Sequence, residues 1–238
     1  MADVLQLAIQ PALIDQVHDR LLAAIADGTF ASGQRLTQES VAAMLGVSRQ
    51  PVSHALQVLK RRGLLIEHGK RGLQVAPIDS RRIRDLYLVR EALDGIAARR
   101  AAQRVKAGEA SEAERKAAQA ALATGRKLGP RSAIARLIDA DVAFHSAIHA
   151  LSGNQAIAET VADQWPHFRR SMGQVLTVSG AYARYWEEHA AILEAVLAGD
   201  AASAEERARR HTARAGEETA LRLEAENTSK TASNGGRP

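Results

Sequence analysis

The spacing of two amphipathic stretches near the N-terminus most constrains the fold of this 238-residue chain. The stretch RLTQESVAAMLG begins at a possible N-cap, Thr37, and its inward face at helical spacing consists of Val41, Met44 and Leu45. The stretch VSRQPVSHALQVLKRRG begins at a second possible N-cap, Ser48, and its buried stripe consists of Val52, Ala55, Leu56 and Leu59. Because only GVS separates the two stretches, they predict a helix-turn-helix.

The flanking segments complete a small domain around these two helices. PALIDQVHDRLLAAIADGTF has apolar residues at helical spacing and closes with Gly28, which predicts a preceding helix. After Gly63, LLIEHGKRGLQVAP alternates as strand, glycine-containing turn and strand, which predicts a two-stranded wing. Residues 1–78 are therefore expected to form a winged helix-turn-helix domain.

The charge of this segment indicates a polyanionic partner. Between residues 49 and 71 the chain has one acid, Glu67, and six basic residues, namely Arg49, Lys60, Arg61, Arg62, Lys70 and Arg71. A winged helix-turn-helix places the N-terminal end of its second helix in the major groove and its wing against the neighbouring backbone. We therefore expect double-stranded DNA as a partner.

Two groups of residues are the expected DNA contacts. The exposed face of the second helix carries Arg49, Gln50, Ser53 and His54, and the wing region carries Arg35, His68, Gly69, Lys70 and Arg71. Arg49 could form a bidentate pair with guanine, and a phosphate clamp is its alternative role. Lys60, Arg61 and Arg62 lie at the far end of the helix and are expected to be solvated or to interact with the helix C-terminus.

Composition excludes several other classes of protein. The chain has no cysteine, which rules out disulfides, a thiolate nucleophile and Cys-ligated metals. No run approaches the roughly 18 apolar residues of a membrane helix, and the N-terminus lacks a signal-peptide pattern. We expect a cytoplasmic protein with no membrane partner.

After Ile78 the sequence becomes rich in Ala, Arg and Glu, with hardly a strand signal. Six amphipathic helical segments are expected, at residues 80–106, 112–127, 131–151, 154–176, 180–198 and 201–224. Short connections between them predict an antiparallel six-helix bundle over residues 79–226. Residues 227–238 lack apolar periodicity and are expected to be a disordered tail. The fold class is therefore mainly α.

The bundle carries a candidate metal site. Asp141, His145 and His149 are four residues apart and share one helix face, whereas His189 and His211 lie on two other helices. A lone histidine more often satisfies a core polar group, but one carboxylate with three imidazoles suits a divalent first-row metal. The predicted ligands are Asp141, His145, His189 and His211, with zinc as the first choice and nickel, manganese or iron as alternatives. His149 lies about 12 Å along the axis from Asp141, and it is expected to line the pocket or a dimer surface.

The first domain resembles a known family. RLTQESVAAMLGVSRQPVSHALQVLKRRGLL, followed by GKRGLQV, is similar to the DNA-binding domain of the GntR family of bacterial transcription regulators. The resemblance covers residues 10–78. Ser53 and His54 replace the Arg and Glu that the family commonly carries, so the operator sequence of the family is not carried over.

The second domain resembles the FCD branch of that family, named after the FadR C-terminal domain. Asp141-x-x-x-His145, the stretch from His189 to Ala204, and His211 match the metal-binding pattern of this branch. Its first helix resembles VREALDGIAARRAA, in which Arg90 and Asp94 recur, and LSGN matches the turn that bears Asn154. Six helices rather than seven resemble the VanR-like subgroup.

The resemblance implies a homodimeric transcription regulator, a repressor and not an enzyme, that binds a pseudo-palindromic operator. Its effector would be a small organic acid or sugar acid, held by the metal with Arg90 and Asn154. A metal-dependent hydrolase is one alternative, because the same ligands can activate water. No HExxH pair or evident general base accompanies them. A regulator that senses the metal itself is the other alternative.

Overall fold

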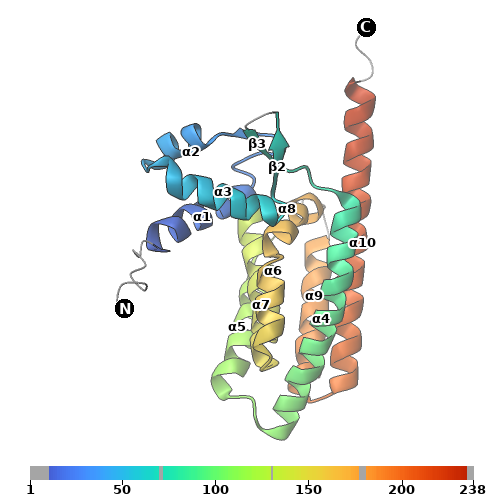
Figure 1. Cartoon of the computed structure of the whole chain (residues 1–238). Coiled ribbons are helices and arrows are strands. Elements are labelled where there is room, and N and C mark those ends of the chain that lie inside the picture. Colours follow the sequence, from blue (N-terminus) through green and yellow to red (C-terminus); the bar gives the residue numbers. More distant parts are fainter. Residues whose placement is uncertain (1–10, 70–71, 130, 177–180, 235–238) are drawn as a thin grey trace, which may run out of the picture. The chain divides into compact units, whose positions relative to one another are not determined.

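The computed structural model describes residues 11–69, 72–129, 131–176 and 181–234 (Figure 1). Internal contacts divide the chain into one compact unit that ends at Pro77 and a second that begins at Ile78. All strands of the described part belong to the first unit, and the second is entirely helical there. The predicted mainly α fold class is confirmed.

The first unit combines three helices with a small antiparallel sheet. Its elements are α1 (Pro11–Ala26), β1 (Arg35–Leu36), α2 (Gln38–Leu45), α3 (Arg49–Arg61), β2 (Leu65–His68) and β3 (Gly72–Val75). The predicted wing is formed by β2 and β3, but β1 pairs with the other edge of β3 and gives the order β1-β3-β2. The two-residue β1 is too short for a periodicity to predict it.

The predicted helix-turn-helix is present with nearly all of its expected core. Thr37 caps α2 by accepting a hydrogen bond from the Ser40 backbone N–H, and Gly46 ends that helix with a positive φ of 66°. The stripe expected on α3 is buried. Met44 was expected to point inward, but 63% of it is exposed. It lies roughly 100° around α2 from the centre of the buried face, because successive residues rotate by about 100°.

The second unit has seven helices in its described part. They are α4 (Ser80–Ala107), α5 (Glu112–Lys127), α6 (Ile134–Leu151), α7 (Gln155–Ala162), α8 (Trp165–Leu176), α9 (Ala181–Leu197) and α10 (Ala201–Asn234). The expected single helix over residues 154–176 is two helices, α7 and α8. A proline ring clashes with the carbonyl four residues earlier, and α7 ends at Ala162, four residues before Pro166. The six-helix count behind the VanR-like assignment is therefore wrong.

Helix α10 extends farther than the sequence analysis expected. It runs to Asn234, well into the stretch 227–238 that was expected to be disordered. No glycine or proline stands between Gly216 and Gly235, so nothing interrupts the propagation of helical hydrogen bonds there. Residues 235–238 lie outside the described part of the chain.

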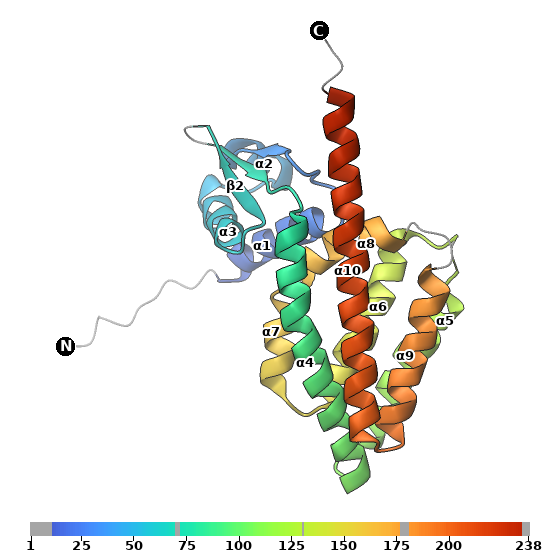
Figure 2. The ribbon, with the colours of Figure 1, turned by 90° about the vertical axis from the view of Figure 1, so that its right-hand side faces the viewer.

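Helices α4 and α10 run side by side in both Figure 1 and Figure 2. Glycines permit this close approach, because a Cβ at Gly216 would lie 2.6 Å from the Tyr87 side chain and one at Gly95 would lie 2.5 Å from that of Arg209. Arg84 adds ion pairs from α4 to Glu217 and Glu224 on α10. Helices α6 and α9 pack against this pair, so all four helices share one apolar core.

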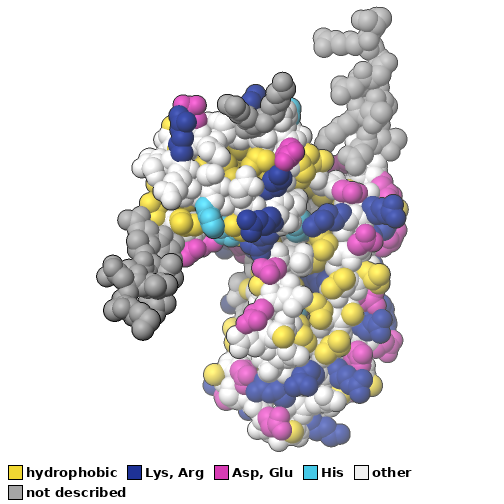
Figure 3. Space-filling view, viewed as in Figure 1, with side chains coloured by type: hydrophobic (Ala, Val, Ile, Leu, Met, Phe, Trp, Pro, Cys, Tyr) yellow, Lys and Arg dark blue, Asp and Glu magenta, His cyan; other side chains and the backbone are white. Residues whose placement is uncertain are grey.

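On the face shown in Figure 3, charged side chains of both signs are scattered over the helical unit, with apolar side chains between them. Among the helices that the structure describes, none combines the length and apolar character needed to cross a membrane.

Gly125 on α5 gives a direct test of the core packing. An added Cβ at this position would lie 1.9 Å from the Trp186 ring. Gly125→Ala should therefore destabilise the helical unit by about 1–3 kcal/mol through overpacking, measured by urea unfolding of metal-free protein. The control is Gly173→Ala on α8, where nothing lies within 4 Å of the added Cβ and stability should rise by about 0.5–1 kcal/mol. Equal unfolding midpoints for the two variants would contradict this packing.

Candidate metal centre and nucleic-acid surface

Three helices bring the four predicted metal ligands together. Asp141 and His145 come from α6, His189 from α9 and His211 from α10. One possible ligand atom from each residue lies within 4.8 Å of all the others. The three imidazoles are buried, whereas the Asp141 side chain keeps 14% of its surface exposed.

The separations between donor atoms suit a single cation. His189 Nε2 lies 3.0 Å from His211 Nε2 and 3.5 Å from Asp141 Oδ1, and His145 Nε2 lies 3.9 Å from Asp141 Oδ2. Donors that each stand about 2.0–2.2 Å from one ion lie about 3–4 Å from one another. Asp141 Oδ2 and His145 Nε2 are buried and have no hydrogen-bond partner within the described part of the chain. Because buried polar atoms are nearly always satisfied, this donor set fits a bound metal ion.

The environment keeps the imidazoles in the form that binds metal. Burial lowers the pKa of His145 and His189 well below the ordinary value, and it lowers the pKa of His211 to about 4. Burial also raises the pKa of Asp141, an effect that Arg90 partly offsets. Neutral imidazole is the ligand form, so no histidine must lose a proton at neutral pH before a metal binds.

Outer carboxylates orient two of the imidazoles. Glu188 Oε2 lies 2.8 Å from His211 Nδ1, which must donate its proton and leave the Nε2 lone pair facing the cluster. Asp94 Oδ2 lies 3.4 Å from His145 Nδ1 and favours the same tautomer. Sequence reasoning missed Glu188, because it precedes His189 in the chain but contacts an imidazole on another helix.

Asp94 on α4 is the centre of a buried polar network. Its carboxylate accepts hydrogen bonds from Arg90 Nε at 3.2 Å, His149 Nε2 at 2.7 Å and Thr212 Oγ1 at 2.8 Å. Burial by itself would raise the pKa of Asp94, but Arg90, His149 and Thr212 together hold it at about 2. The carboxylate is therefore ionised at neutral pH and links α4, α6 and α10.

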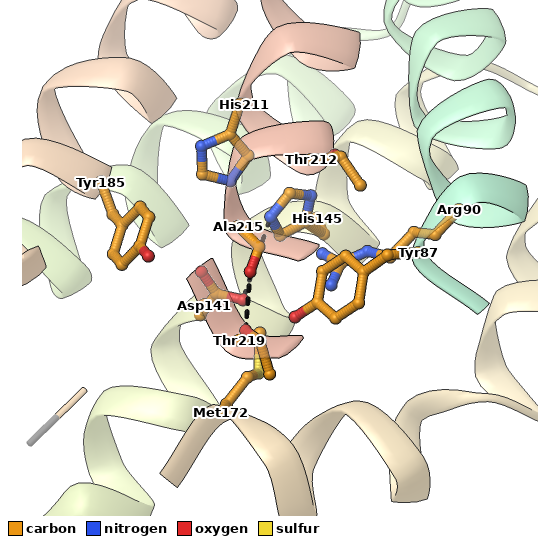
Figure 4. Close-up of a pocket in the computed structure, with 10 residues that line it drawn as sticks. All are labelled: Tyr87, Arg90, Asp141, His145, Met172, Tyr185, His211, Thr212, Ala215 and Thr219. Carbon is orange, nitrogen blue, oxygen red and sulfur yellow. Dashed lines mark hydrogen bonds and ion pairs between the residues drawn. The ribbon is translucent and has the colours of Figure 1, made fainter. Parts of the chain in front are cut away.

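A small cavity of about 30 Å³ opens beside the donor cluster (Figure 4). It is lined by Tyr87, Arg90, Asp141, His145, Met172, Tyr185, His211, Thr212, Ala215 and Thr219. The guanidinium of Arg90 lies 4.6 Å from the ring centroid of Trp165 and 5.0 Å from that of Phe168, which fixes its place in the wall. A cationic group among four hydroxyl side chains suits a small anionic ligand that carries hydroxyl groups.

Sequence reasoning identified Arg90 in this wall but missed the hydroxyl residues. Tyr87 could have been found, because Tyr87, Arg90 and Asp94 follow the i, i+3, i+7 spacing of one helix face. Tyr185, Thr212 and Thr219 carry no comparable signal in the sequence, since their placement depends on how α9 and α10 pack.

The structure places two residues expected at the effector site away from the cavity wall. His149 was expected to line the pocket or a dimer surface, but it is buried outside the cavity wall and bound to Asp94. Its imidazole points from α6 toward α4, where the ionised carboxylate needs a donor. Asn154 was expected to help bind the effector, but it is the N-cap residue of α7 and does not line the cavity.

The first unit presents the residues expected to contact DNA. Arg49, Gln50 and His54 are exposed on α3, and Ser53 is half-buried and accepts a hydrogen bond from Gln38 Nε2 at 3.0 Å. Arg49 Nη2 lies 2.7 Å from Glu39 Oε1, an exposed ion pair that costs little to break.

The residues expected in and around the wing are also at the surface where they are described. Arg35 is exposed on β1, and His68 and Gly69 are exposed at the start of the wing turn. Gly69 has a φ of 64°, a backbone conformation that favours glycine. Lys70 and Arg71 lie outside the described residues.

Comparison with known proteins matches each unit to a family. Residues 13–75 match the bacterial regulatory proteins of the gntR family, and residues 85–214 match the FCD domain. The chain is 29% identical over 188 residues to an HTH-type transcriptional regulator in an unstable DNA locus of Streptomyces ambofaciens, covering 76% of this chain and 74% of the relative. It is 30% identical to the HTH-type transcriptional repressor RspR of Escherichia coli K12, covering 47% and 49%.

The likeness in structure extends over nearly the whole chain. The structure of E. coli McbR/YncC has a TM-score of 0.73 at 19% identity and covers 91% of this chain and 99% of its own. At that identity the likeness shows the fold alone. By sequence, the chain spans about half or less of the length of most curated relatives it matches.

Proposed function

This chain belongs to the gntR family of bacterial regulatory proteins and carries their FCD domain, and from that premise we propose that it is a DNA-binding transcription repressor controlled by a small carboxylate. Two copies would bind a pseudo-palindromic operator through α3 and the wing. The effector would occupy the cavity of the helical unit.

The observation that carries this proposal is the donor cluster that opens onto the cavity beside Arg90. Asp141, His145, His189 and His211 would hold a divalent ion, with zinc as the first choice for three imidazoles and a carboxylate. When bound, the ion would supply positive charge and an open coordination position for a carboxylate oxygen. Nickel, manganese and iron accept the same ligands.

The side chains of the cavity wall would bind the rest of the effector. Arg90 would offer its remaining guanidinium donors to a carboxylate, and Tyr87 would donate a hydrogen bond to a further oxygen. This chemistry suits a small organic acid or sugar acid, which is the effector class we propose.

Binding can alter DNA affinity only if the DNA-bound and released arrangements bind the effector unequally. Arg90 and Asp94 lie on α4, which begins two residues after Ile78, the first residue of the second unit. A shift in the Arg90–Asp94 pair on effector binding would therefore act on the first helix that follows the DNA-binding unit in the chain.

Two other functions use the same residues. A metal-dependent hydrolase would need a free carboxylate beside the ligands as general base, but Asp94 is paired with Arg90 and Glu188 is paired with His211 and Arg214. A sensor of the metal itself would release DNA on chelation without any organic ligand.

The metal site is tested by replacing one ligand and one neighbouring histidine. His189→Ala should lower zinc affinity by more than about 100-fold, beyond the roughly 10–100-fold that loss of an outer partner costs. The matched control is His167→Ala, which removes a buried imidazole from α8 that does not belong to the donor set. Metal content of the dialysed proteins should show one ion per chain in the wild type and the control. Equal zinc content in all three proteins would exclude this ligand set.

Effector control is tested with zinc-loaded protein, duplex DNA selected from a random library, and a panel of lactate, malate, citrate and gluconate. At least one acid should weaken DNA binding. The same acid should raise the melting temperature, because a ligand at 100 times its Kd stabilises the folded state by about 2.7 kcal/mol. Arg90→Lys should weaken that response about tenfold or more, since lysine cannot form a bidentate pair. Arg100→Lys on the exposed side of α4 should leave it unchanged. Hydrolysis of ester or amide substrates with unaltered DNA affinity would support the hydrolase instead.

The DNA surface is tested at Arg49. Arg49→Ala should weaken binding to the selected sequence by about 1–3 kcal/mol if the side chain pairs with a base, measured by fluorescence anisotropy at fixed salt. Arg61→Ala, an exposed arginine at the other end of α3, is the control and should change little. The same loss on every DNA sequence would show that Arg49 contacts phosphate only.

A further inference from the structure

The exposed face of α3 is extended by a side chain that comes from α2. Gln38 is the first residue of α2, and its Nε2 donates a hydrogen bond to Ser53 Oγ on α3 at 3.0 Å. Helices α2 and α3 pack against each other (Figure 1). Ser53 follows Arg49 by four residues and therefore shares its face of α3. The carboxamide of Gln38 is thus held beside the residue expected to pair with guanine.

The two partners of this hydrogen bond differ in exposure and reach. Ser53 is half-buried, and its hydroxyl oxygen is only one bond beyond Cβ. Gln38 is exposed, and its amide atoms are three bonds beyond Cβ. Gln38 also lines a hollow of about 230 Å³ between α3 and the wing, which leaves space beside its side chain. A base edge that approaches α3 would therefore meet the Gln38 amide before the Ser53 hydroxyl.

The hydrogen bond to Ser53 leaves Gln38 with the groups needed to read one base. A glutamine carboxamide has two N–H donors and a carbonyl acceptor. Ser53 takes one N–H, and the Gln38 side chain makes no other hydrogen bond among the residues that the structure describes. One N–H and the carbonyl oxygen remain on the same planar group. This is the pair that bonds N7 and N6 of adenine in the major groove.

We propose that Gln38 reads an adenine of the operator from the start of α2, and that Ser53 holds its carboxamide in place. The assignment rests on the DNA binding of the proposed function and adds a base-reading residue to it. Arg49 and Ser53 are about one helical turn apart, roughly 5.4 Å along α3, and successive bases are about 3.4 Å apart. The adenine therefore lies one or two base pairs from the guanine that Arg49 would read.

The residue next to Gln38 supports the same arrangement. Glu39 Oε1 lies 2.7 Å from Arg49 Nη2. Two adjacent residues at the start of α2 thus hold two side chains one turn apart on α3. Because a side chain that is already ordered loses less freedom on binding, the hydrogen bond to Ser53 favours a specific contact by Gln38.

Two other roles of Gln38 lead to different results. A side chain that only supports α3 would affect DNA affinity without changing the preferred base at any position. A contact to phosphate would affect every DNA sequence equally, because phosphates carry no sequence information directly. Only a base contact changes the preference at one position of the operator.

The first experiment changes the chemistry of the amide at nearly constant shape. Gln38→Glu replaces the N–H donors with acceptors, and a carboxylate accepts a hydrogen bond from cytosine N4. An acid in the first turn of α2 also suits the helix dipole, so the variant should fold. Sites selected from a random DNA library by the full-length protein should carry adenine at one position for the wild type. The variant should select cytosine there and leave the other positions unchanged.

The matched control for the added charge is Gln16→Glu. Gln16 is exposed on α1 and makes no contact with Ser53. This variant should select the same sites as the wild type, including the adenine. Loss of the adenine preference in the control would show that net charge, and not the position of Gln38, causes the change.

The second experiment removes each partner of the hydrogen bond. Fluorescence anisotropy at fixed salt compares the selected site with sites that carry each other base at the adenine position. Gln38→Ala should bind the selected site about 5- to 150-fold more weakly, the range of one bidentate contact, and should no longer distinguish the four bases there. Ser53→Ala should reduce the same preference by a smaller factor. The double variant should lose no more than Gln38→Ala, because Ser53 acts through Gln38.

The outcomes separate this assignment from the proposed function. If both Gln38 variants select the same sites as the wild type, or if the position that they change is not an adenine, the base contact is wrong while DNA binding stands. An equal loss on every sequence likewise overturns it. If the wild-type protein prefers no DNA sequence over others, the base contact and the proposed repressor both fail.

Discussion

The helical unit depends on a charged carboxylate held in its interior. Asp94 stays ionised because Arg90, His149 and Thr212 donate to it from three helices. Removing one partner of a buried ion pair costs about 3–5 kcal/mol, so the arrangement strongly constrains how α4, α6 and α10 pack. The same carboxylate lies next to His145, and the same arginine lines the cavity. The candidate metal ligands and the wall of the cavity are thereby positioned by one network.

This network explains why the site is preorganised. Neutral imidazoles point inward because burial disfavours their protonation and because Glu188 and Asp94 engage the opposite ring nitrogens of His211 and His145. The unpartnered atoms, Asp141 Oδ2 and His145 Nε2, remain on the inner side of the cluster. A cation would satisfy both, and it would sit beside an arginine that can neutralise an acid. The chemistry therefore favours recognition of anions over hydrolysis.

Much of the fold follows from local patterns. Helix-capping residues, the GVS turn and the apolar stripe of α3 are local, so the winged helix-turn-helix could be predicted from the sequence, apart from the short strand β1. The break between α7 and α8 was also encoded locally, by Pro166, but the apolar periodicity on either side concealed it. Met44 was misplaced because α2 is only eight residues long, and so short a helix has a poorly defined inner face.

The sequence by itself predicted the candidate donor set, because Asp141 and His145 share one turn of a helix and His189 and His211 are the histidines of the last two helices. Only the tertiary structure decided the partners of those residues. His149 shares a face of α6 with His145, and both contact Asp94, but only His145 also belongs to the donor cluster. Which side chains meet depends on the depth of each one in the bundle and not on its spacing along the chain. Glu188 and the hydroxyl groups of the cavity were likewise placed by packing between helices, since side-chain contacts across a bundle leave no periodic signal in the sequence.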